Sequence, residues 1–269
     1  MKEILKISGD IFENTSCCHE DREPLQCSCR ECCQPTYYGQ KESYSCIKKS
    51  CYYVMNYGPS YASEIFHFLN MNPFIKNLGK NQVNVLSLGC GFGSDLLAIE
   101  KYLVTNLIKG KVDYHGIDIE KNWELLRPPK FSSNFCTADV FHELPKIDLS
   151  KYNVIFLNKF FSTLLNIGRH EEFLKLFSEK IKTAWGKNCF VVFNDVNHFK
   201  LGRDFFHNHM KTIFQKSYQY YFKLKGAYNN NFEAIEEYKN VFEVPDLLPK
   251  SSLPTVTKTV FFLYENVFK

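Results

Sequence analysis

A tight glycine-rich turn is the first feature of this sequence that could do chemistry. The apolar run VNVLSLG leads into Gly89-Cys90-Gly91-Phe92-Gly93, and a helical pattern begins at Ser94. Such a turn between a strand and a helix presents backbone N–H groups at the carboxyl edge of a sheet, where ligands of α/β proteins bind. The third glycine comes one residue too early for a dinucleotide fingerprint, and no Gly-Lys-Ser/Thr follows, which excludes a P-loop. The alternative is a turn that only packs the helix tightly on the sheet.

Clustered cysteines are the second such feature. Eight of the eleven cysteines precede residue 52, namely Cys17, Cys18, Cys27, Cys29, Cys32, Cys33, Cys46 and Cys51. Cys29-x-x-Cys32 has the spacing of a zinc knuckle, and Cys46 and Cys51 could close a tetrahedral thiolate site. The other four, with His19, could hold a second zinc ion or supply the true partners. Disulfides would need an oxidising compartment, and the spacings match neither common iron–sulfur pattern. Residues 1–51 are therefore predicted to form a zinc module.

This module could serve either of two roles. It could bind nucleic acid through basic side chains near the phosphates, namely Arg22, Arg30, Lys48 and Lys49. It could instead clamp a ligand pocket, because Cys51 leads directly into a tyrosine-rich helical segment. Nearby acidic residues balance the basic ones, which favours the clamp.

Strand-like and helical segments alternate after residue 52. Strands are expected at 83–89, 112–118, 132–140, 152–158, 188–195, 217–228 and 256–268, and helices at 52–72, 94–108, 170–185 and, as a candidate, 231–242. A turn is expected at Gly58-Pro59 within the first helical segment. The pattern predicts an α/β fold, a doubly wound, mostly parallel seven-stranded sheet with an antiparallel C-terminal edge hairpin, in a domain over residues 52–269.

Composition narrows the class of protein. The chain of 269 residues is 45% hydrophobic and contains 25 Phe and 16 Tyr, which predicts a folded core. The net charge of +4 permits nucleic-acid binding without arguing for it. No apolar stretch has the length of a signal peptide or of a membrane span, so a cytoplasmic protein with no membrane partner is expected. Nothing in the sequence indicates the oligomeric state.

From about residue 52 the chain resembles the class I S-adenosylmethionine-dependent methyltransferases. VLSLGCGFGSD is similar to their first motif, G-x-G-x-G after strand one. HGIDIE carries Asp118 where the family's acidic residue binds the ribose hydroxyls, and TADVFHELP carries Asp139 where the family contacts the adenine. YNVIFLNKF corresponds to strand four, whose end faces the methyl group. The expected C-terminal strand pair is similar to the family's edge hairpin.

The resemblance implies S-adenosyl-L-methionine as cofactor and a set of residues that would bind it. That set is Ser87, Gly89, Cys90, Gly91, Gly93, Asp118, Ile119, Asp139, Val140, Asn158, Tyr57 and Tyr61. An ionised carboxylate such as Asp118 can accept hydrogen bonds from both ribose hydroxyls. Ser87 stands where the family often has an acidic residue, and Asp95 could compensate. The two tyrosines continue a four-residue spacing from Tyr53 and would form a lid over the cofactor or, alternatively, ordinary core packing.

A methyltransferase must align the acceptor and, where needed, remove its proton. Polar residues at the expected ends of strands four and five are the candidates: Asn158, Lys159, Asn194, Asp195 and His198. Asp195 or His198 would be the base, and Asn158 a further catalytic residue. The alternative is that these side chains cap the next helix or bind water. Neither Asn-Pro-Pro-Tyr nor Asp-Pro-Pro-Tyr occurs, so the likeness to amino-methylating DNA enzymes ends at their acceptor motif.

These patterns together predict a methyltransferase with an N-terminal zinc module and a small-molecule acceptor of unknown identity. Two alternatives stay open. One is an RNA methyltransferase that uses the zinc module to bind its substrate. The other is a non-catalytic S-adenosylmethionine-binding sensor or partner subunit.

Overall fold

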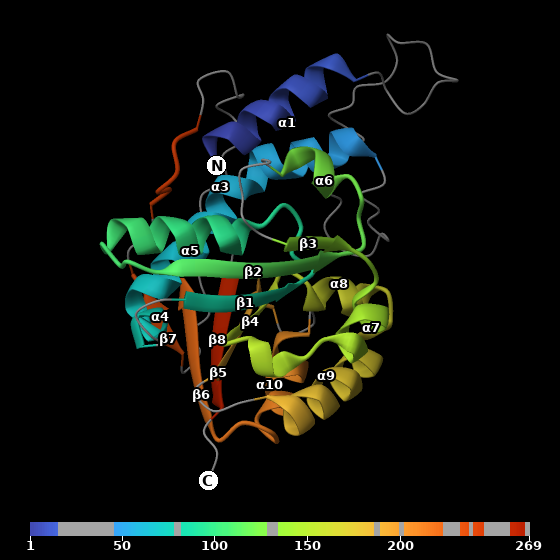
Figure 1. Ribbon diagram of the computed structural model, residues 1–269, viewed down its shortest axis with the longest axis vertical. Helices are drawn as coiled ribbons and strands as arrows, with labels where there is room; N and C mark the ends of the chain where they lie inside the picture. The colour runs from blue at the N-terminus through green and yellow to red at the C-terminus, as the bar shows by residue number, and fades with distance from the viewer. Residues whose placement is uncertain are drawn as a thin grey trace.

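One mixed sheet is the central element of the structure (Figure 1). The computed structural model describes residues 1–15, 46–77, 82–127, 134–185, 189–198, 202–222, 232–236, 239–244 and 259–266. Within these ranges the sheet has eight strands in the order β3-β2-β1-β4-β5-β8-β6-β7. The strands are β1 (Gln82–Leu88), β2 (Lys111–Asp118), β3 (Asn134–Thr137), β4 (Val154–Asn158), β5 (Cys189–Val196), β6 (Lys216–Phe222), β7 (Glu233–Ile235) and β8 (Thr259–Asn266).

The direction of the strands agrees with the expected α/β class. Strands β3, β2, β1, β4 and β5 pair in parallel, and β8 pairs antiparallel with both β5 and β6. The mostly parallel sheet and the antiparallel pairing of the two expected C-terminal strands are therefore confirmed. The strand order reverses between β1 and β4. In open α/β sheets, ligands bind outside the carboxyl ends of the strands at such a point.

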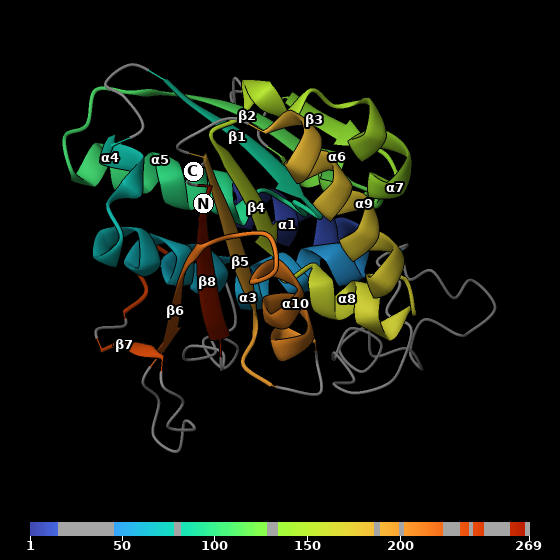
Figure 2. The same ribbon diagram turned by 90° about the horizontal axis from the view of Figure 1, so that it is seen from below.

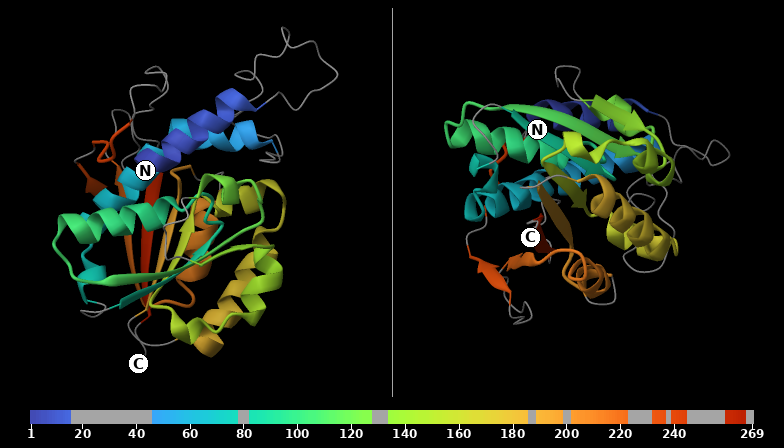
Figure 3. Two further views of the ribbon diagram at one scale, coloured as in Figure 1. Left: turned by 45° about the horizontal axis from the view of Figure 1, so that its top comes forward. Right: turned by 60° about the horizontal axis from the view of Figure 1, so that its bottom comes forward.

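Helices cover both faces of the sheet (Figures 2 and 3). They are α1 (Lys2–Asn14), α3 (Ile47–Met71), α4 (Phe74–Asn77), α5 (Ser94–Thr105), α6 (Trp123–Leu126), α7 (Val140–Glu143), η1 (Leu144–Lys146), η2 (Leu149–Lys151), α8 (Phe161–Asn166), α9 (His170–Ala184) and α10 (Arg203–Met210). Helices α3, α4 and α5 pack on one face, and α7 to α10 pack on the other. Helix α1 lies along α3 (Figure 3). None of the helices in the described ranges is long and apolar enough to cross a membrane.

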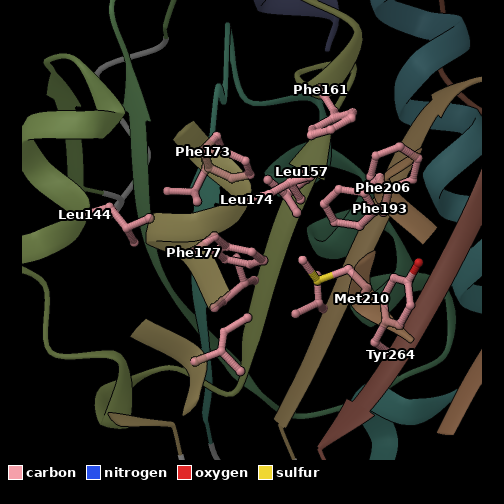
Figure 4. Close-up of a cluster of buried hydrophobic side chains, with 14 of the residues drawn as sticks. Leu144, Leu157, Phe161, Phe173, Leu174, Phe177, Phe193, Phe206, Met210 and Tyr264 are labelled. Atoms are coloured by element: carbon pink, nitrogen blue, oxygen red, sulfur yellow. The ribbon is translucent and has the colours of Figure 1, made fainter. Parts of the chain in front are cut away.

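The inner strands are buried on both faces, and their side chains alternate between two apolar cores. Phe156 and Val192 face α3 and α5, whereas Leu157 and Phe193 face α8, α9 and α10. Figure 4 shows the second core, where aromatic rings of α8, α9 and α10 lie against Leu157 of β4 and Phe193 of β5. The ring of Phe206 stacks on that of Phe193 with centroids 4.3 Å apart. Burial on both faces explains why these strands read as unbroken apolar runs in the sequence.

Helix α3 runs from Ile47 to Met71 through Pro59, so the turn expected at Gly58-Pro59 was wrong. Proline inside a helix removes one backbone hydrogen bond and costs about 3 kcal/mol. Packing of α3 against the sheet, α1 and α5 offsets this cost. Gly58 provides the space for one such contact, because a Cβ atom there would lie 3.3 Å from the Phe92 ring. The Ser63 hydroxyl also donates a hydrogen bond to the Pro59 carbonyl, at 2.7 Å.

The expected domain boundary between residues 51 and 52 falls inside α3. Ile4 and Leu5 of α1 share one apolar cluster with Cys51, Leu97 and Trp123. The described parts of residues 1–51 therefore pack on the rest of the fold. The division into two domains stays a prediction, because residues 16–45 lie outside the described ranges.

Strand β7 occupies part of the segment where a helix at 231–242 was the expectation, and that expectation was wrong for residues 233–235. Ile235 is buried in the core and is the register partner of Phe222 on β6. Burial of this single apolar side chain at the sheet edge favours a strand over an exposed helix. The strand raises the sheet from the expected seven strands to eight.

A buried imidazole in the second core predicts a pH-dependent stability. His207 Nδ1 lies 2.9 Å from the Tyr264 hydroxyl, and Nε2 lies 2.6 Å from the Gln219 amide nitrogen. Burial, together with the positive charges of Lys211 and Arg203, lowers the pKa of His207 from 6.5 to about 4, and Asp204 opposes these effects. Between these pH values the unfolded chain takes up a proton that the folded protein excludes, so stability falls as the pH falls.

Urea unfolding at pH 7 and pH 4 tests this dependence. The free energy of unfolding of the wild type should fall by about 1–2 kcal/mol more than that of His207→Gln, which cannot take up the proton. Other titrating groups contribute equally to both proteins, so only the difference between them reports on His207. Equal losses in both proteins would contradict the prediction.

Candidate functional site

The glycine turn joins β1 to α5 at the carboxyl edge of the sheet. Gly89, Gly91 and Gly93 have φ values of 68°, 53° and 87°, a left-handed conformation that costs other residues about 1–2 kcal/mol. The N–H groups of Gly89 and Cys90 both donate to the carbonyl of Ile117, at 2.8 and 3.1 Å. The turn is therefore fixed to the end of β2.

The three glycines differ in what surrounds them. A Cβ atom would lie 2.3 Å from the Phe160 ring at Gly89 and 3.2 Å from the Phe135 ring at Gly93, so these two glycines allow close packing. At Gly91 the nearest atom would be in Trp123, at 3.9 Å. Gly91 is thus the point of the turn where another molecule can approach the backbone.

Asp118, the last residue of β2, connects its strand to Gly91 in the glycine turn. Its Oδ2 accepts a hydrogen bond from Gly91 N at 2.8 Å, and its Oδ1 accepts one from Glu120 N at 2.9 Å. Burial raises the pKa of the Asp118 carboxyl, while the N–H groups of Glu120 and Gly91 and the guanidinium of Arg127 oppose the rise. The Trp123 side chain is a further hydrogen-bond partner of this carboxylate, which has about four lone-pair sites, so part of its acceptor capacity is left for a ligand.

Arg127 holds the other side of the glycine turn and is not among the site residues expected from the sequence. Its Nη2 donates to the Gly91 carbonyl at 2.6 Å, and its guanidinium lies 4.0 Å from the centroid of the Phe135 ring. No periodic pattern marks this residue, which stands in the segment LLRPPK. Only the folded chain brings it to the turn.

Asp118 and Ile119 lie at the end of β2, and Asp139 and Val140 follow β3. The two pairs differ in exposure and contacts. Ile119 is 70% exposed, and Val140 is buried. Asp139 begins α7 by accepting a hydrogen bond from Phe141 N at 2.9 Å, and it forms an ion pair of 3.0 Å with Arg169. The Asp139 carboxylate is therefore engaged within the protein, whereas Ile119 offers an apolar side chain to solvent beside Asp118.

Ser87 and Asp95 come together beneath the glycine turn. Both are buried, and the hydroxyl of Tyr114 donates to Asp95 Oδ1 at 2.9 Å. Burial raises the pKa of the Asp95 carboxyl, while the Ser87 and Tyr114 hydroxyls oppose the rise. Burial together with the charge of Asp118 raises the pKa of the neighbouring Cys90 thiol well above its usual value, so this residue stays a neutral thiol.

The expected tyrosine stripe forms one continuous aromatic surface on α3. The ring centroids of Tyr53 and Tyr57 lie 5.4 Å apart, and those of Tyr57 and Tyr61 lie 5.6 Å apart. Tyr53 also contacts Trp123, which follows β2, with centroids 5.9 Å apart. The ammonium of Lys159, which follows β4, lies 4.9 Å from the Tyr61 ring centroid. The stripe thus extends along the carboxyl edge from β2 to β4.

Lys159 forms a buried ion pair that no pattern in the sequence predicts. Its Nζ lies 3.4 Å from Glu64 Oε2, and the two side chains are 8% and 0% exposed. The same ammonium donates to Thr259 Oγ1 at 2.6 Å, and Thr259 donates to Glu64 at 3.0 Å. The φ of Lys159 is 53°, a left-handed conformation that is uncommon outside glycine. These contacts hold α3 against the carboxyl end of β4 and the start of β8.

Asp195 and His198, the expected bases, occupy different settings. Asp195 Oδ2 accepts a hydrogen bond from Ser162 N at 2.9 Å, and Oδ1 accepts one from Val196 N at 2.7 Å. Burial raises the pKa of Asp195, and Lys159 opposes the rise. Its carboxylate therefore holds the first turn of α8, which follows β4. His198 is partly buried beyond the end of β5, and its backbone N–H donates to Val196 O at 2.8 Å.

Asn158 and Asn194 are register partners at the ends of β4 and β5. Asn158 Nδ2 donates to Ser94 Oγ at 2.6 Å. Asn158 Oδ1 and both amide atoms of Asn194 are buried and have no hydrogen-bond partner among the described residues. The structure therefore brings these two candidates together at the same edge.

The expected zinc module is not supported by the part of the chain that the structure describes. In that part, no group of three or more His, Cys, Asp or Glu side chains could hold a metal ion. Cys46 precedes α3, and Cys51 is fully buried in the cluster that includes Ile4, Leu5 and Val54. The other six expected ligands, Cys17, Cys18, Cys27, Cys29, Cys32 and Cys33, lie outside the described ranges.

No protein-family model and no curated protein matches this chain. Solved structures with a similar fold include an S-adenosylmethionine-dependent methyltransferase from Archaeoglobus fulgidus, at 13% identity, with 76% of this chain and 94% of that chain covered and a TM-score of 0.47. The plantazolicin methyltransferase BpumL, in complex with S-adenosylhomocysteine, has 14% identity, coverage of 81% and 88%, and a TM-score of 0.46. A probable spermidine synthase from Corynebacterium glutamicum has 10% identity, coverage of 79% and 64%, and a TM-score of 0.42. Likenesses this distant assign no activity to the chain.

The buried ion pair predicts a large effect of a single substitution. Lys159→Met should lower the free energy of unfolding by about 3 kcal/mol, because it leaves the Glu64 carboxylate buried without its ammonium. Lys159→Met combined with Glu64→Gln should recover part of this loss, since no charge then stays buried. Urea unfolding measures both effects.

Lys216→Met is the matched control. Its ion pair with Glu265 spans 3.5 Å, but the Lys216 side chain is 52% exposed. This change should cost less than about 1 kcal/mol, as is usual for surface pairs. Similar losses for the two lysines would contradict the assignment of a buried pair.

Proposed function

We propose that the chain is an S-adenosylmethionine-dependent methyltransferase. The observation that carries the proposal is the arrangement of Gly91, Asp118 and Ile119 at the carboxyl ends of β1 and β2. Gly91 is open to approach, Asp118 is fixed beside it with acceptor capacity left, and Ile119 is 70% exposed next to Asp118.

These residues fit the parts of the cofactor. Asp118 would accept hydrogen bonds from the two ribose hydroxyls. Ile119 would cover one face of the adenine, and the backbone at Gly91 would allow the amino-acid part of the cofactor to pass close to the turn. Ser87 and Asp95 would complete the site below the turn. The remaining residues of the expected set belong to the proposal only through the resemblance of the sequence to the family.

When bound, the cofactor would supply a methyl group carried by a sulfonium. An acceptor lone pair would take this methyl group, and the electrons of the broken C–S bond would stay on sulfur. The protein's part is to align the two molecules and to exclude water. The tyrosine stripe of α3 would cover this edge, since it spans the distance from Trp123 to Lys159. Of the two expected bases, His198 would take a proton from the acceptor where it carries one. The Asp195 carboxylate is directed to the opposite face of the sheet, where it accepts from Ser162 N, so it could serve as a base only after leaving this contact.

We propose a small molecule as acceptor, because the polar groups at the ends of β4 and β5 are buried under α3. A zinc module over residues 1–51 and a cytoplasmic location stay part of the proposal on the strength of the sequence alone. The non-catalytic alternative keeps one observation in its favour: the position of the family's acidic residue is held by Ser87.

Calorimetry with S-adenosylmethionine tests the cofactor site. Asp118→Asn should weaken binding at least tenfold, because the charged hydrogen bonds to the ribose are lost, at a cost of about 1.4 kcal/mol or more. Ile119→Ser should weaken it about threefold to tenfold through lost apolar contact. Asp113→Asn, an exposed position on the same strand, is the control and should bind like the wild type.

Thermal unfolding of the same variants separates binding from folding. Ile119→Ser should leave the melting temperature unchanged, because the side chain is exposed in the free protein. Unchanged affinity in both Asp118→Asn and Ile119→Ser would rule out this cofactor site. Binding by the wild type without formation of S-adenosylhomocysteine over a broad acceptor panel would favour the non-catalytic alternative.

A further inference from the structure

Asn158 and Asn194, here called the asparagine pair, share one face of the sheet. Along β4 and β5 the residues two positions earlier, Phe156 and Val192, pack with α3 and α5, so the pair points to the same side. The hydrogen bond from Asn158 to Ser94, the first residue of α5, agrees with this direction.

Three polar atoms of the pair are buried without a partner among the described residues: Asn158 Oδ1, Asn194 Oδ1 and Asn194 Nδ2. Asn194 is fully buried and Asn158 is 9% exposed. Each unmade hydrogen bond of this kind is a free-energy cost that the folded protein carries. A ligand that supplied the missing partners would recover this free energy on binding. The pair offers it two carbonyl oxygens and one NH₂ group.

The pair lies on the acceptor side of the proposed cofactor. Neighbouring strands are about 4.8 Å apart, so Asn194 is two strands, or about 10 Å, from the strand that carries the glycine turn. Helix α3 passes above it, because Phe68 stacks at 4.6 Å on Phe261, the register partner of Asn194 on β8. A ligand reaches Asn194 only when the elements above it move.

Charge adjacent to the pair is already compensated. Lys159 follows Asn158 in the chain, and its ammonium is paired with Glu64. The Asp195 carboxylate points to the other face, where it holds α8. Recognition by the pair therefore depends on neutral hydrogen bonds.

We propose that the asparagine pair binds a neutral carboxamide or lactam group of the small-molecule acceptor. Such a group carries an N–H donor beside a C=O acceptor in one plane. Its N–H would donate to an asparagine Oδ1, and its carbonyl would accept from Asn194 Nδ2. This inference rests on the proposed function, because the methyl acceptor is the molecule expected at this place.

The test uses protein saturated with S-adenosylhomocysteine, with benzamide and 2-pyridone as probes in ligand-observed NMR. Both should bind, and acetophenone, which has the shape of benzamide without the N–H group, should bind at least fivefold more weakly. Asn194→Leu should weaken benzamide at least tenfold and leave the affinity for S-adenosylhomocysteine unchanged. Asn106→Leu, at the far end of α5, is the control and should change neither affinity.

Thermal unfolding gives an independent readout. Asn194→Leu should raise the melting temperature, since it replaces an unpaired buried amide by an apolar group of similar size. An asparagine with only a structural role would give the opposite shift. Asn194→Ala is the second variant if leucine prevents folding, and it should lose benzamide binding as well.

Three results would overturn the inference: no binding of either probe, equal benzamide affinity in wild type and both Asn194 variants, or a parallel loss of S-adenosylhomocysteine, which would place the pair against the cofactor. Failure of the proposed function looks different. In that case the wild type itself does not bind S-adenosylhomocysteine.

Discussion

The hydrogen bonds between the glycine turn and the end of β2 fix the geometry on which the rest of the site depends. The Ile117 carbonyl accepts two N–H groups of the turn, and Asp118 accepts a third from Gly91. These bonds exist only because the turn can adopt left-handed backbone angles at three positions. They set where α5 begins, and so where Ser94 meets Asn158. A ligand at this edge would encounter a backbone that is already arranged.

Helix α3 provides the second half of the site. It is held at one end by Trp123 against Tyr53 and further along by Lys159 against Glu64 and Tyr61. The first contact is aromatic, and the second is a buried ion pair. Buried pairs contribute little net stability but penalise any arrangement that separates them. The Lys159–Glu64 pair therefore specifies the position of α3 over the sheet more than it stabilises the fold.

The elements that could be predicted from the sequence are those whose local pattern and tertiary role agree. Strands β1, β4 and β5 read as apolar runs because both of their faces are buried, and the turn after β1 needs glycine wherever it occurs. The turn expected at Gly58-Pro59 was wrong because the packing of α3 outweighs the usual effect of proline on a helix. Strand β7 is too short to leave a periodic signal.

The contacts within the site were less accessible to sequence reasoning. Glu64 and Lys159 are 95 positions apart, and nothing in their neighbours marks them as partners. Arg127 reaches the glycine turn only through the path of the chain after β2. Asp195 was expected among the candidates for a base, but its role in holding α8 depends on a helix that precedes it in the chain. Residue type and strand position could be predicted, whereas the identity of the partners could not.

The insertion of β8 between β5 and β6 has a consequence for biosynthesis. When a ribosome has made β5 and β6, both still lack the neighbour that joins them, and that neighbour begins only at Thr259. Until then Phe193 lacks the stacking ring of Phe262, and the edge of β5 has open backbone groups. From the completion of β5 until β8 is made, the nascent chain must therefore carry an apolar, unpaired strand edge, a state that chaperones bind and that otherwise aggregates.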